Sequence, residues 1–475
     1  MTGVKGPRRT IGKCPPPDIA TDTETIICTG QIIIPGLINI HAHLVQSLLR
    51  GLAKDLPLHN WLCDAIWPLE SSYEGRDGYH AARLTITEML KTGTTTFLDP
   101  MITYRAGWEQ VCEAVGEMGI RGCLGKLIKF PETNRQLSIT NPRDKDLRNI
   151  SIPTLIDKHH ENHTNYNNRL HVWAAAGTPR GAPASLYREL GETCAEHGIS
   201  ITMHCAEAPR DSAMEFIRDT KLCGQPSSNP DNSEENDGKD RTHNLVLAHM
   251  VNLDLETDLP LLAATGTSVA HNPSSNLKLA SGIAPVPAML AHTSQTPTTV
   301  GLGTVGAPCS NHYDMIQEMH LASILHKGVN NDASLIPAET ALEMATIHGA
   351  RALGLEKEIG SLEVGKKADV VFLDPYGRGG IGAAPWDWES ENEGQGGVTA
   401  VTTVVHGCTG RDVSLVMVDG EILVRDGVLV DGGREREMEI VRNAQVAVRG
   451  IRESLLCTKI GEQEEHYIVY DVQDR

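Results

Sequence analysis

Two histidines, His41 and His43, close an apolar run that predicts a β-strand over residues 32–44. Residues i and i+2 of a strand share a face, so both imidazoles can point at one metal ion. Twenty histidines in 475 residues give about one such pair by chance. The place of the pair at the end of an apolar strand is therefore what makes it a candidate for metal binding.

Three further histidines follow predicted strands in the same way: His204 in MHCAE, His249 in VLAHM and His271 in VAHNPSSN. Glu207 stands three residues after His204, where a carboxylate can move protons to and from a bound substrate. Taken alone, a core histidine beside a surface glutamate is the ordinary alternative. Histidines at the ends of four predicted strands, the first, fifth, sixth and seventh along the chain, are hard to assign to independent accidents, so the pattern indicates a site.

The strands that must position these residues alternate with helical stretches between about residues 32 and 354. The strand-like runs cover residues 32–44, 94–100, 120–130, 170–178, 199–207, 244–253, 267–273 and 299–304. Helical periodicity predicts helices such as residues 78–93 and 184–198, and both stretches end in glycine, a helix stop signal. Eight strands alternating with helices predict a TIM-like (β/α)8 barrel, an α/β fold whose active site lies at the strand C-terminal ends.

The pattern changes after residue 355, where two strand-rich segments with Asp-Gly turn signals appear. They predict a small β-sandwich domain beside the barrel, followed by a charged helix over 434–456. Polar loops are expected at 223–241 and 377–397. The predicted division is residues 1–33 (the short N-terminal part of the sandwich), 34–356 (barrel), 357–433 (the C-terminal part of the sandwich) and 434–475 (helix and tail).

Composition narrows the classes of partner. The formal net charge is −19, which argues against non-specific binding to nucleic acid or to an anionic membrane surface. The basic N-terminus is followed by no apolar run, and no stretch approaches the roughly 18 apolar residues of a membrane span. Eleven cysteines without CxxC pairs fit reduced thiols, so a cytoplasmic enzyme is expected.

Six ordered blocks together resemble the amidohydrolase superfamily, in particular its branch of triazine chlorohydrolases, guanine deaminases and S-adenosylhomocysteine deaminases. The blocks are PGLINIHAHL, LLRGLAKDLPLHNWLCDAIWPLE, TEMLKTGTTTFLD, MHCAEAP, HNPSSNLKLASGIAPV and EIGSLEVGKKADVVFLD. The resemblance runs from about residue 26 to residue 430. It implies a hydrolase of non-peptide C–N bonds that deaminates a purine-like or triazine-like heteroaromatic substrate. Dechlorination is the alternative reaction, because it needs the same activated water.

The resemblance also implies roles for individual residues. His41, His43 and His204 match three ligands of one divalent metal, Zn²⁺ or alternatively Fe²⁺, which lowers the pKa of bound water. Glu207 matches the proton shuttle, and His249 matches the histidine that orients the hydroxide. His271 and the following NPSSN segment, residues 272–276, match the rim of the substrate pocket. Relatives are often homodimers, and the helical block 59–70 with its two tryptophans fits either an interface or packing over the barrel.

Two features depart from the family pattern. Val305 stands where the family has its fourth metal ligand, an aspartate, and valine can neither bind a metal nor accept a proton. Three histidines can still hold zinc, but the lost proton acceptor is typically worth about 10²–10⁴-fold in rate. Asp314 fits the N-cap of the next helix better than a substitute ligand. We therefore expect impaired or altered catalysis, with an inactive barrel that serves as a binding protein as the alternative. The other departure is the short run before PGLINIHAHL, for which two explanations are open: an incomplete β-sandwich or a misassigned chain start.

Overall fold

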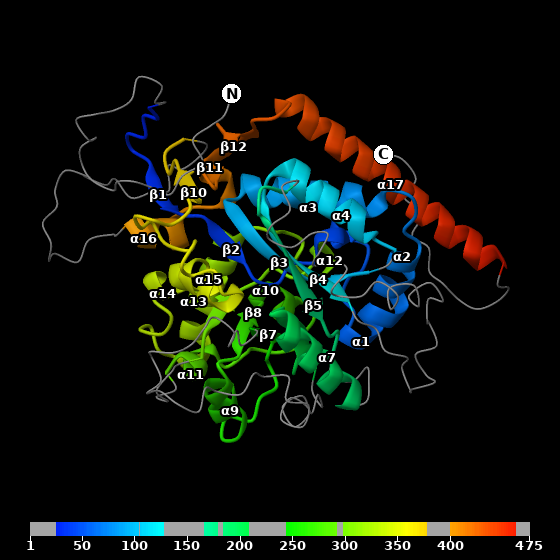
Figure 1. The fold of residues 1–475 in the computed structure, drawn as a ribbon, viewed down its shortest axis with the longest axis horizontal. Coiled ribbons are helices and arrows are strands. Elements are labelled where there is room, and N and C mark those ends of the chain that lie inside the picture. The colour runs from blue at the N-terminus through cyan, green and yellow to red at the C-terminus, as the bar shows by residue number, and fades with distance from the viewer. Residues whose placement is uncertain are drawn as a thin grey trace, which may run out of the picture.

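The computed structural model describes residues 25–103, 105–127, 166–178, 184–208, 244–291, 298–377 and 400–461. Its centre is an eight-stranded parallel sheet in which the strands follow one another in chain order (Figure 1). The strands are β2 (Leu37–Asn39), β3 (Thr94–Ile102), β4 (Arg121–Leu127), β5 (Leu170–Ala175), β6 (Ile201–Cys205), β7 (Leu245–His249), β8 (Ser268–His271) and β9 (Val300–Leu302). Each lies within or largely overlaps a run predicted from the sequence.

The first and last strands meet and close the sheet into a barrel. The Ile40 amide donates to the Leu302 carbonyl at 3.0 Å. Beyond the strand ends, the Val305 amide donates to the His41 carbonyl at 2.8 Å, and the His43 amide donates to the Val305 carbonyl at 3.1 Å. These bonds confirm the predicted TIM-like architecture, and they bring residue 305 beside the two histidines of the first strand.

The first predicted strand is in fact two strands in different sheets. β1 (Ile32–Pro35) ends just before Gly36, and β2 begins just after it. A Cβ atom at Gly36 would lie 2.1 Å from the Thr95 side-chain oxygen, so only glycine fits at this crossing. The run looked continuous in sequence because the residues on both sides of Gly36 are apolar, although Ile33 on β1 is exposed.

Helices surround the barrel and fill its connections. In the first half of the chain they are η1 (Leu44–Leu49), α1 (Leu58–Asn60), η2 (Trp61–Ile66), α2 (Trp67–Ser71), α3 (Asp77–Lys91), α4 (Trp108–Met118) and α7 (Ala184–His197). They continue with α9 (Asp258–Thr265), α10 (Pro273–Lys278), α11 (Val286–Ala291), α12 (Ala307–Ser310), α13 (Met315–Asn330), α14 (Ala338–Met344), α15 (Ile347–Leu353), α16 (Ala400–Thr402), η5 (Thr403–Gly407) and η6 (Gly410–Asp412). Trp61 is buried in the main core, which favours the packing role for this block.

A separate five-stranded antiparallel sheet is built from both parts of the chain outside the barrel. β1 pairs with β10 (Val370–Leu373), which continues to β11 (Val413–Val418), β12 (Glu421–Arg425) and β13 (Val428–Leu429). The prediction of a small β-domain formed from both chain ends is thereby confirmed. The predicted loop at 223–241 and nearly all of the one at 377–397 lie outside the described residues, and the domain boundaries stay a prediction.

A buried ion pair joins the barrel to this sheet. Arg121 on β4 and Asp369, just before β10, are both almost fully buried, and an Arg121 guanidinium nitrogen lies 3.0 Å from a carboxylate oxygen of Asp369. The same carboxylate accepts the Asp419 backbone amide at 2.7 Å. Asp369 therefore satisfies donors from both the barrel and the second sheet.

Replacing Asp369 by asparagine is expected to lower the free energy of unfolding by about 3–5 kcal/mol, because the Arg121 charge would stay buried without its counter-charge. Chemical denaturation of the purified variant measures this loss. Glu363→Gln is a suitable control, since the Glu363 carboxylate pairs with Lys366 but is largely exposed. Equal stabilities of the two variants would contradict the assigned role of the pair.

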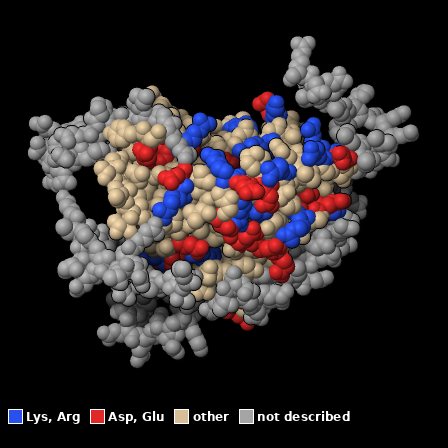
Figure 2. Space-filling view, turned by 90° about the horizontal axis from the view of Figure 1, so that it is seen from above, with Lys and Arg blue, Asp and Glu red and all other residues tan. Residues whose placement is uncertain are grey.

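The C-terminal helix α17 (Gly433–Gly461) lies across the outside of the barrel and packs on α3 (Figure 1). Ion pairs join α17 to α3 and α4, with N–O distances of 3.2 Å for Arg83–Glu439, 2.8 Å for Lys91–Glu437 and 2.6 Å for Arg436–Glu117. The face in Figure 2 accordingly shows both charge signs intermixed. The predicted charged helix is confirmed and extends beyond residue 456. Among the described residues, no helix is long and apolar enough to cross a bilayer.

Candidate metal centre

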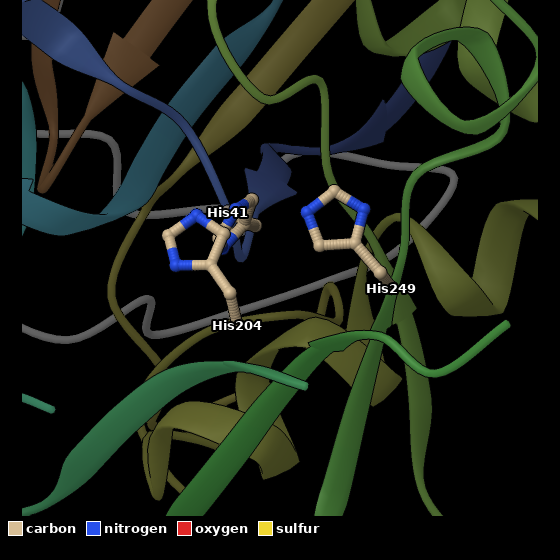
Figure 3. A group of neighbouring side chains, drawn as sticks. All are labelled: His41, His204 and His249. Atoms are coloured by element: carbon tan, nitrogen blue, oxygen red, sulfur yellow. The ribbon is translucent and has the colours of Figure 1, made fainter. Parts of the chain in front are cut away.

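Three barrel strands bring histidine rings together at their C-terminal ends. His41 follows β2, His204 lies on β6 and His249 ends β7, and each offers a ring nitrogen within 4.8 Å of the others (Figure 3). The ring centroid of His41 lies 4.7 Å from that of His204 and 5.3 Å from that of His249. Residues separated by more than 200 positions thus face one small volume.

His43 belongs to the same cluster through its contact with His204. Their Nε2 atoms lie 3.2 Å apart, and His204 Nδ1 lies 3.2 Å from the Gly177 carbonyl oxygen. A carbonyl only accepts, so this contact makes Nδ1 the protonated nitrogen and turns the Nε2 lone pair toward His43. Two nitrogens about 2.0–2.1 Å from one tetrahedral ion would stand at nearly this separation.

Burial keeps the clustered imidazoles in the neutral form that binds metals. Desolvation lowers the pKa of His41 and His43 well below the usual value, and neighbouring histidines add to the effect. Desolvation followed by His249 lowers the pKa of His204 to about 4. Both ring nitrogens of His41 are buried without a hydrogen-bond partner among the described residues. Convergent neutral lone pairs fit a divalent cation and would be costly without one.

A carboxylate and an amide stand beside this cluster. Glu207 follows β6, and its Oε1 lies 3.6 Å from His249 Nδ1. The same Nδ1 lies 2.7 Å from Asn276 Oδ1. The Asn252 side chain donates to the carbonyl oxygens of Ala206 and Glu207, at 3.3 and 3.0 Å, so the loops after β6 and β7 are tied together. The Asn252 bonds fix the backbone that carries Glu207 relative to the loop after His249.

His271 is fully buried at the end of β8 and contacts a residue that sequence reasoning missed. Its Nε2 lies 3.3 Å from Nε2 of His326 on α13, and the two ring centroids are 5.2 Å apart. The sequence signal was a row of residues at helical spacing, all of which are buried in the structure. The row consists of Met315, Met319, Ala322 and His326. Asn276 ends the NPSSN segment that the family resemblance assigns to the pocket rim, but its contact with His249 was not predicted, because it depends on where α10 lies relative to the end of β7.

Val305 occupies an unusual backbone conformation next to His41 and His43. It is buried and has a φ of 61°, a left-handed value that a β-branched side chain rarely adopts. Ala206 and His249, at the neighbouring strand ends, also have positive φ. Strained backbone of this kind clusters at functional sites. Asp314 caps α13 by accepting the Ile316 amide at 2.9 Å, which confirms the predicted N-cap.

The neutral buried histidines predict a loss of stability in acid for the metal-free protein. The pKa values of His204 and His326 fall to about 4 in the folded state, below the unfolded value of about 6.5. Between these values the unfolded chain binds protons that the folded chain does not, so stability falls as the pH drops from about 6.5 to about 4. Each such histidine contributes a slope of at most about 1.4 kcal/mol per pH unit.

Denaturant unfolding of the metal-free chain at several pH values measures this slope. The variant His326→Gln is expected to show a shallower dependence, because it removes one of the groups that take up a proton on unfolding. The buried carboxyls of Asp99 and Glu318, with pKa values raised to about 7 and about 8, act in the opposite direction, so the slopes of the two chains are compared. Equal slopes for the wild type and His326→Gln would show that His326 takes up a proton as readily in the folded protein as in the unfolded chain.

Comparisons with known proteins agree with this geometry. The model of the amidohydrolase family matches residues 32–423. A 5-methylthioadenosine/S-adenosylhomocysteine deaminase of Moorella thermoacetica is 35% identical over 416 residues, which cover 85% of this chain and 84% of that protein. A 5'-deoxyadenosine deaminase of Methanothermobacter thermautotrophicus is 32% identical, with 90% of each chain covered.

A solved structure is similar as well. The crystal structure of an adenosine deaminase from Xanthomonas campestris with bound zinc superposes with a TM-score of 0.72 at 27% identity. The superposition covers 89% of this chain and 87% of the adenosine deaminase chain. The similarity therefore extends over the barrel and the second sheet together.

Proposed function

The chain belongs to the amidohydrolase family, and from that premise we propose that it removes the exocyclic amino group of an adenosine-like nucleoside by hydrolysis. Its relatives are deaminases of 5-methylthioadenosine, S-adenosylhomocysteine and 5'-deoxyadenosine. The observation that carries the proposal is the convergence of His41, His43, His204 and His249 beside Glu207, at the C-terminal ends of the barrel strands.

One divalent metal, zinc by preference, would be held by His41, His43 and His204. The support is that these rings are buried together, with His43 and His204 in contact through their Nε2 atoms. The pKa of His41 is lowered, and neither of its ring nitrogens has a hydrogen-bond partner among the described residues. When bound, such a metal lowers the pKa of a water molecule to about 7 and makes hydroxide available at neutral pH. The remaining chemistry belongs to the side chains around it.

Glu207 is proposed to carry protons between the nucleophilic water and the substrate. Its side chain is only 11% exposed and stands beside His249, so it can face a substrate that covers the cluster. In deamination, water adds to the ring carbon that bears the amino group while a ring nitrogen takes up a proton. The C–N bond then breaks, ammonia leaves with a proton, and a ring carbonyl remains.

His249 is proposed to accept a hydrogen bond from the nucleophile and so orient it toward the ring. His271 is proposed to form part of the wall of the substrate pocket. The support for His271 is its position on β8, the strand next to β7 and His249, and its contact with His326, which holds the ring in one orientation.

The test is ammonia release by the zinc-loaded full chain from 5'-methylthioadenosine, S-adenosylhomocysteine, 5'-deoxyadenosine, adenosine and guanine. We expect turnover of at least one adenosine-like compound, dependent on zinc and lost on chelation. Chloride release from a chlorotriazine in place of deamination would favour the dechlorinase alternative. A zinc-binding chain that turns over no member of either class would favour the inactive binding protein, for which Val305 is the main support.

A further inference from the structure

The His249 imidazole has a defined neighbour on the side away from His41. Its Nδ1 lies 2.7 Å from Asn276 Oδ1, and both residues are almost fully buried. An amide oxygen accepts and cannot donate, so in this contact His249 Nδ1 carries the hydrogen. A neutral imidazole with its hydrogen on Nδ1 has its lone pair on Nε2.

Glu207 supports the same arrangement of hydrogens. Its Oε1 lies 3.6 Å from His249 Nδ1, which is too far for a hydrogen bond but close enough for electrostatic attraction. A carboxylate at this side favours Nδ1–H over an Nδ1 lone pair. If the Asn276 amide were reversed, its NH₂ group would face Nδ1, and Nε2–H would then point toward the metal centre.

Asn276 is itself held by the chain around it. It lies on α10, where its backbone amide donates to the Asn272 carbonyl at 3.0 Å and its carbonyl accepts the Ser281 amide at 2.9 Å. The backbone of Asn276 is therefore held by the short helix after β8, from which its side-chain oxygen reaches His249 Nδ1. His249 ends β7 and has a φ of 77°, so the contact joins its ring to an element that follows the next strand, β8.

We propose that Asn276 is a positioning residue: its side-chain oxygen holds His249 in the Nδ1–H tautomer, so that Nε2 faces the metal centre as a hydrogen-bond acceptor for the nucleophile. The proposal rests on the proposed hydrolase function. It has added weight in this chain because Val305 supplies no oxygen at the position where the family has an acceptor. His249 is then the neutral acceptor that remains beside the nucleophile.

Nitrogen-15 NMR of the zinc-loaded full chain labelled at histidine tests the tautomer without reference to activity. The signals of His249 are identified by their absence in His249→Gln. In the wild type we expect a protonated Nδ1 and an unprotonated Nε2. Asn276→Asp keeps an acceptor and is expected to keep this pattern, whereas Asn276→Leu is expected to show a mixed or reversed one. Asn443→Leu, on α17 far along the chain, is the matched control.

Steady-state kinetics on 5'-methylthioadenosine provide the second measurement. A tautomer that presents Nε2–H to the nucleophile is expected to lower kcat about 10²–10⁴-fold in Asn276→Leu, with KM changed by less than about threefold. Asn276→Asp should recover at least part of kcat. A purely structural role would instead lower the yield of folded, zinc-binding protein in both variants alike.

An Nε2–H signal for His249 in the wild type would overturn the proposal, and so would an Asn276→Leu variant that keeps both the wild-type NMR pattern and kcat. If the wild type shows no turnover of any compound in the panel, the proposed function fails. The ¹⁵N pattern then still decides whether Asn276 sets the tautomer of His249. The two failures are thereby distinguishable.

Discussion

Replacing Val305 by aspartate is expected to raise kcat/KM for the adenosine-like substrate about 10²–10⁴-fold, the usual contribution of a positioned proton acceptor. The Val305 amide donates to the His41 carbonyl, and the Val305 carbonyl accepts the His43 amide. A side chain at this position therefore lies at the edge of the metal centre. Aspartate also tolerates the left-handed backbone of this position better than valine does. Steady-state kinetics of the zinc-loaded variant measure the gain.

The control for this change is Val305→Asn. Asparagine has nearly the same shape as aspartate and tolerates the same backbone, but its amide is a poor base and a weak zinc ligand. An increase confined to Val305→Asp would therefore be due to the carboxylate. If both variants gain equally, relief of backbone strain explains the change. If neither gains, the valine does not limit the reaction.

The second large effect is expected for Glu207→Gln, which should lower kcat about 10²–10⁴-fold while zinc stays bound. Glutamine preserves the size and hydrogen-bonding capacity of the side chain but cannot take up and return a proton. Because Glu207 stands beside His249 and is not itself one of the clustered ring donors, we expect the zinc content to remain at one ion per chain. Kinetics and metal analysis on the same preparation test both parts.

Glu196→Gln is the matched control, since Glu196 is an exposed residue of α7 and has no contact with the centre. A Glu207→Gln variant with wild-type kcat would remove the proton shuttle from the mechanism. Loss of zinc together with loss of activity would instead assign Glu207 to the metal centre.

Much of the architecture could be predicted from local patterns. Alternation of apolar runs with helical periodicity located all eight barrel strands, because parallel strands buried on both faces are nearly continuous in hydrophobic residues. The prediction failed at Gly36, where one apparent strand divides between two sheets. That division depends on the contact of Gly36 with Thr95, which is a tertiary contact between residues far apart in the chain.

The candidate site shows the same limit. The sequence by itself identified His41, His43, His204 and His249, because each follows an apolar strand and parallel strands end at one face of a barrel. It also identified Val305 as the departure from the family pattern. The backbone conformation at residue 305 was not predictable from the sequence. Its positive φ occurs where the Val305 amide and carbonyl are hydrogen-bonded to the backbones of His41 and His43.

The tertiary structure alone decided which side chains stand behind these histidines. Asn276 on α10 reaches His249 at the end of β7, and His326 on α13 reaches His271 at the end of β8. Such contacts depend on the angle and depth at which helices pack, which periodicity does not encode. The sequence therefore determined the residue types at the strand ends, whereas the packing of helices around the barrel decided their burial, their neighbours and hence their chemistry.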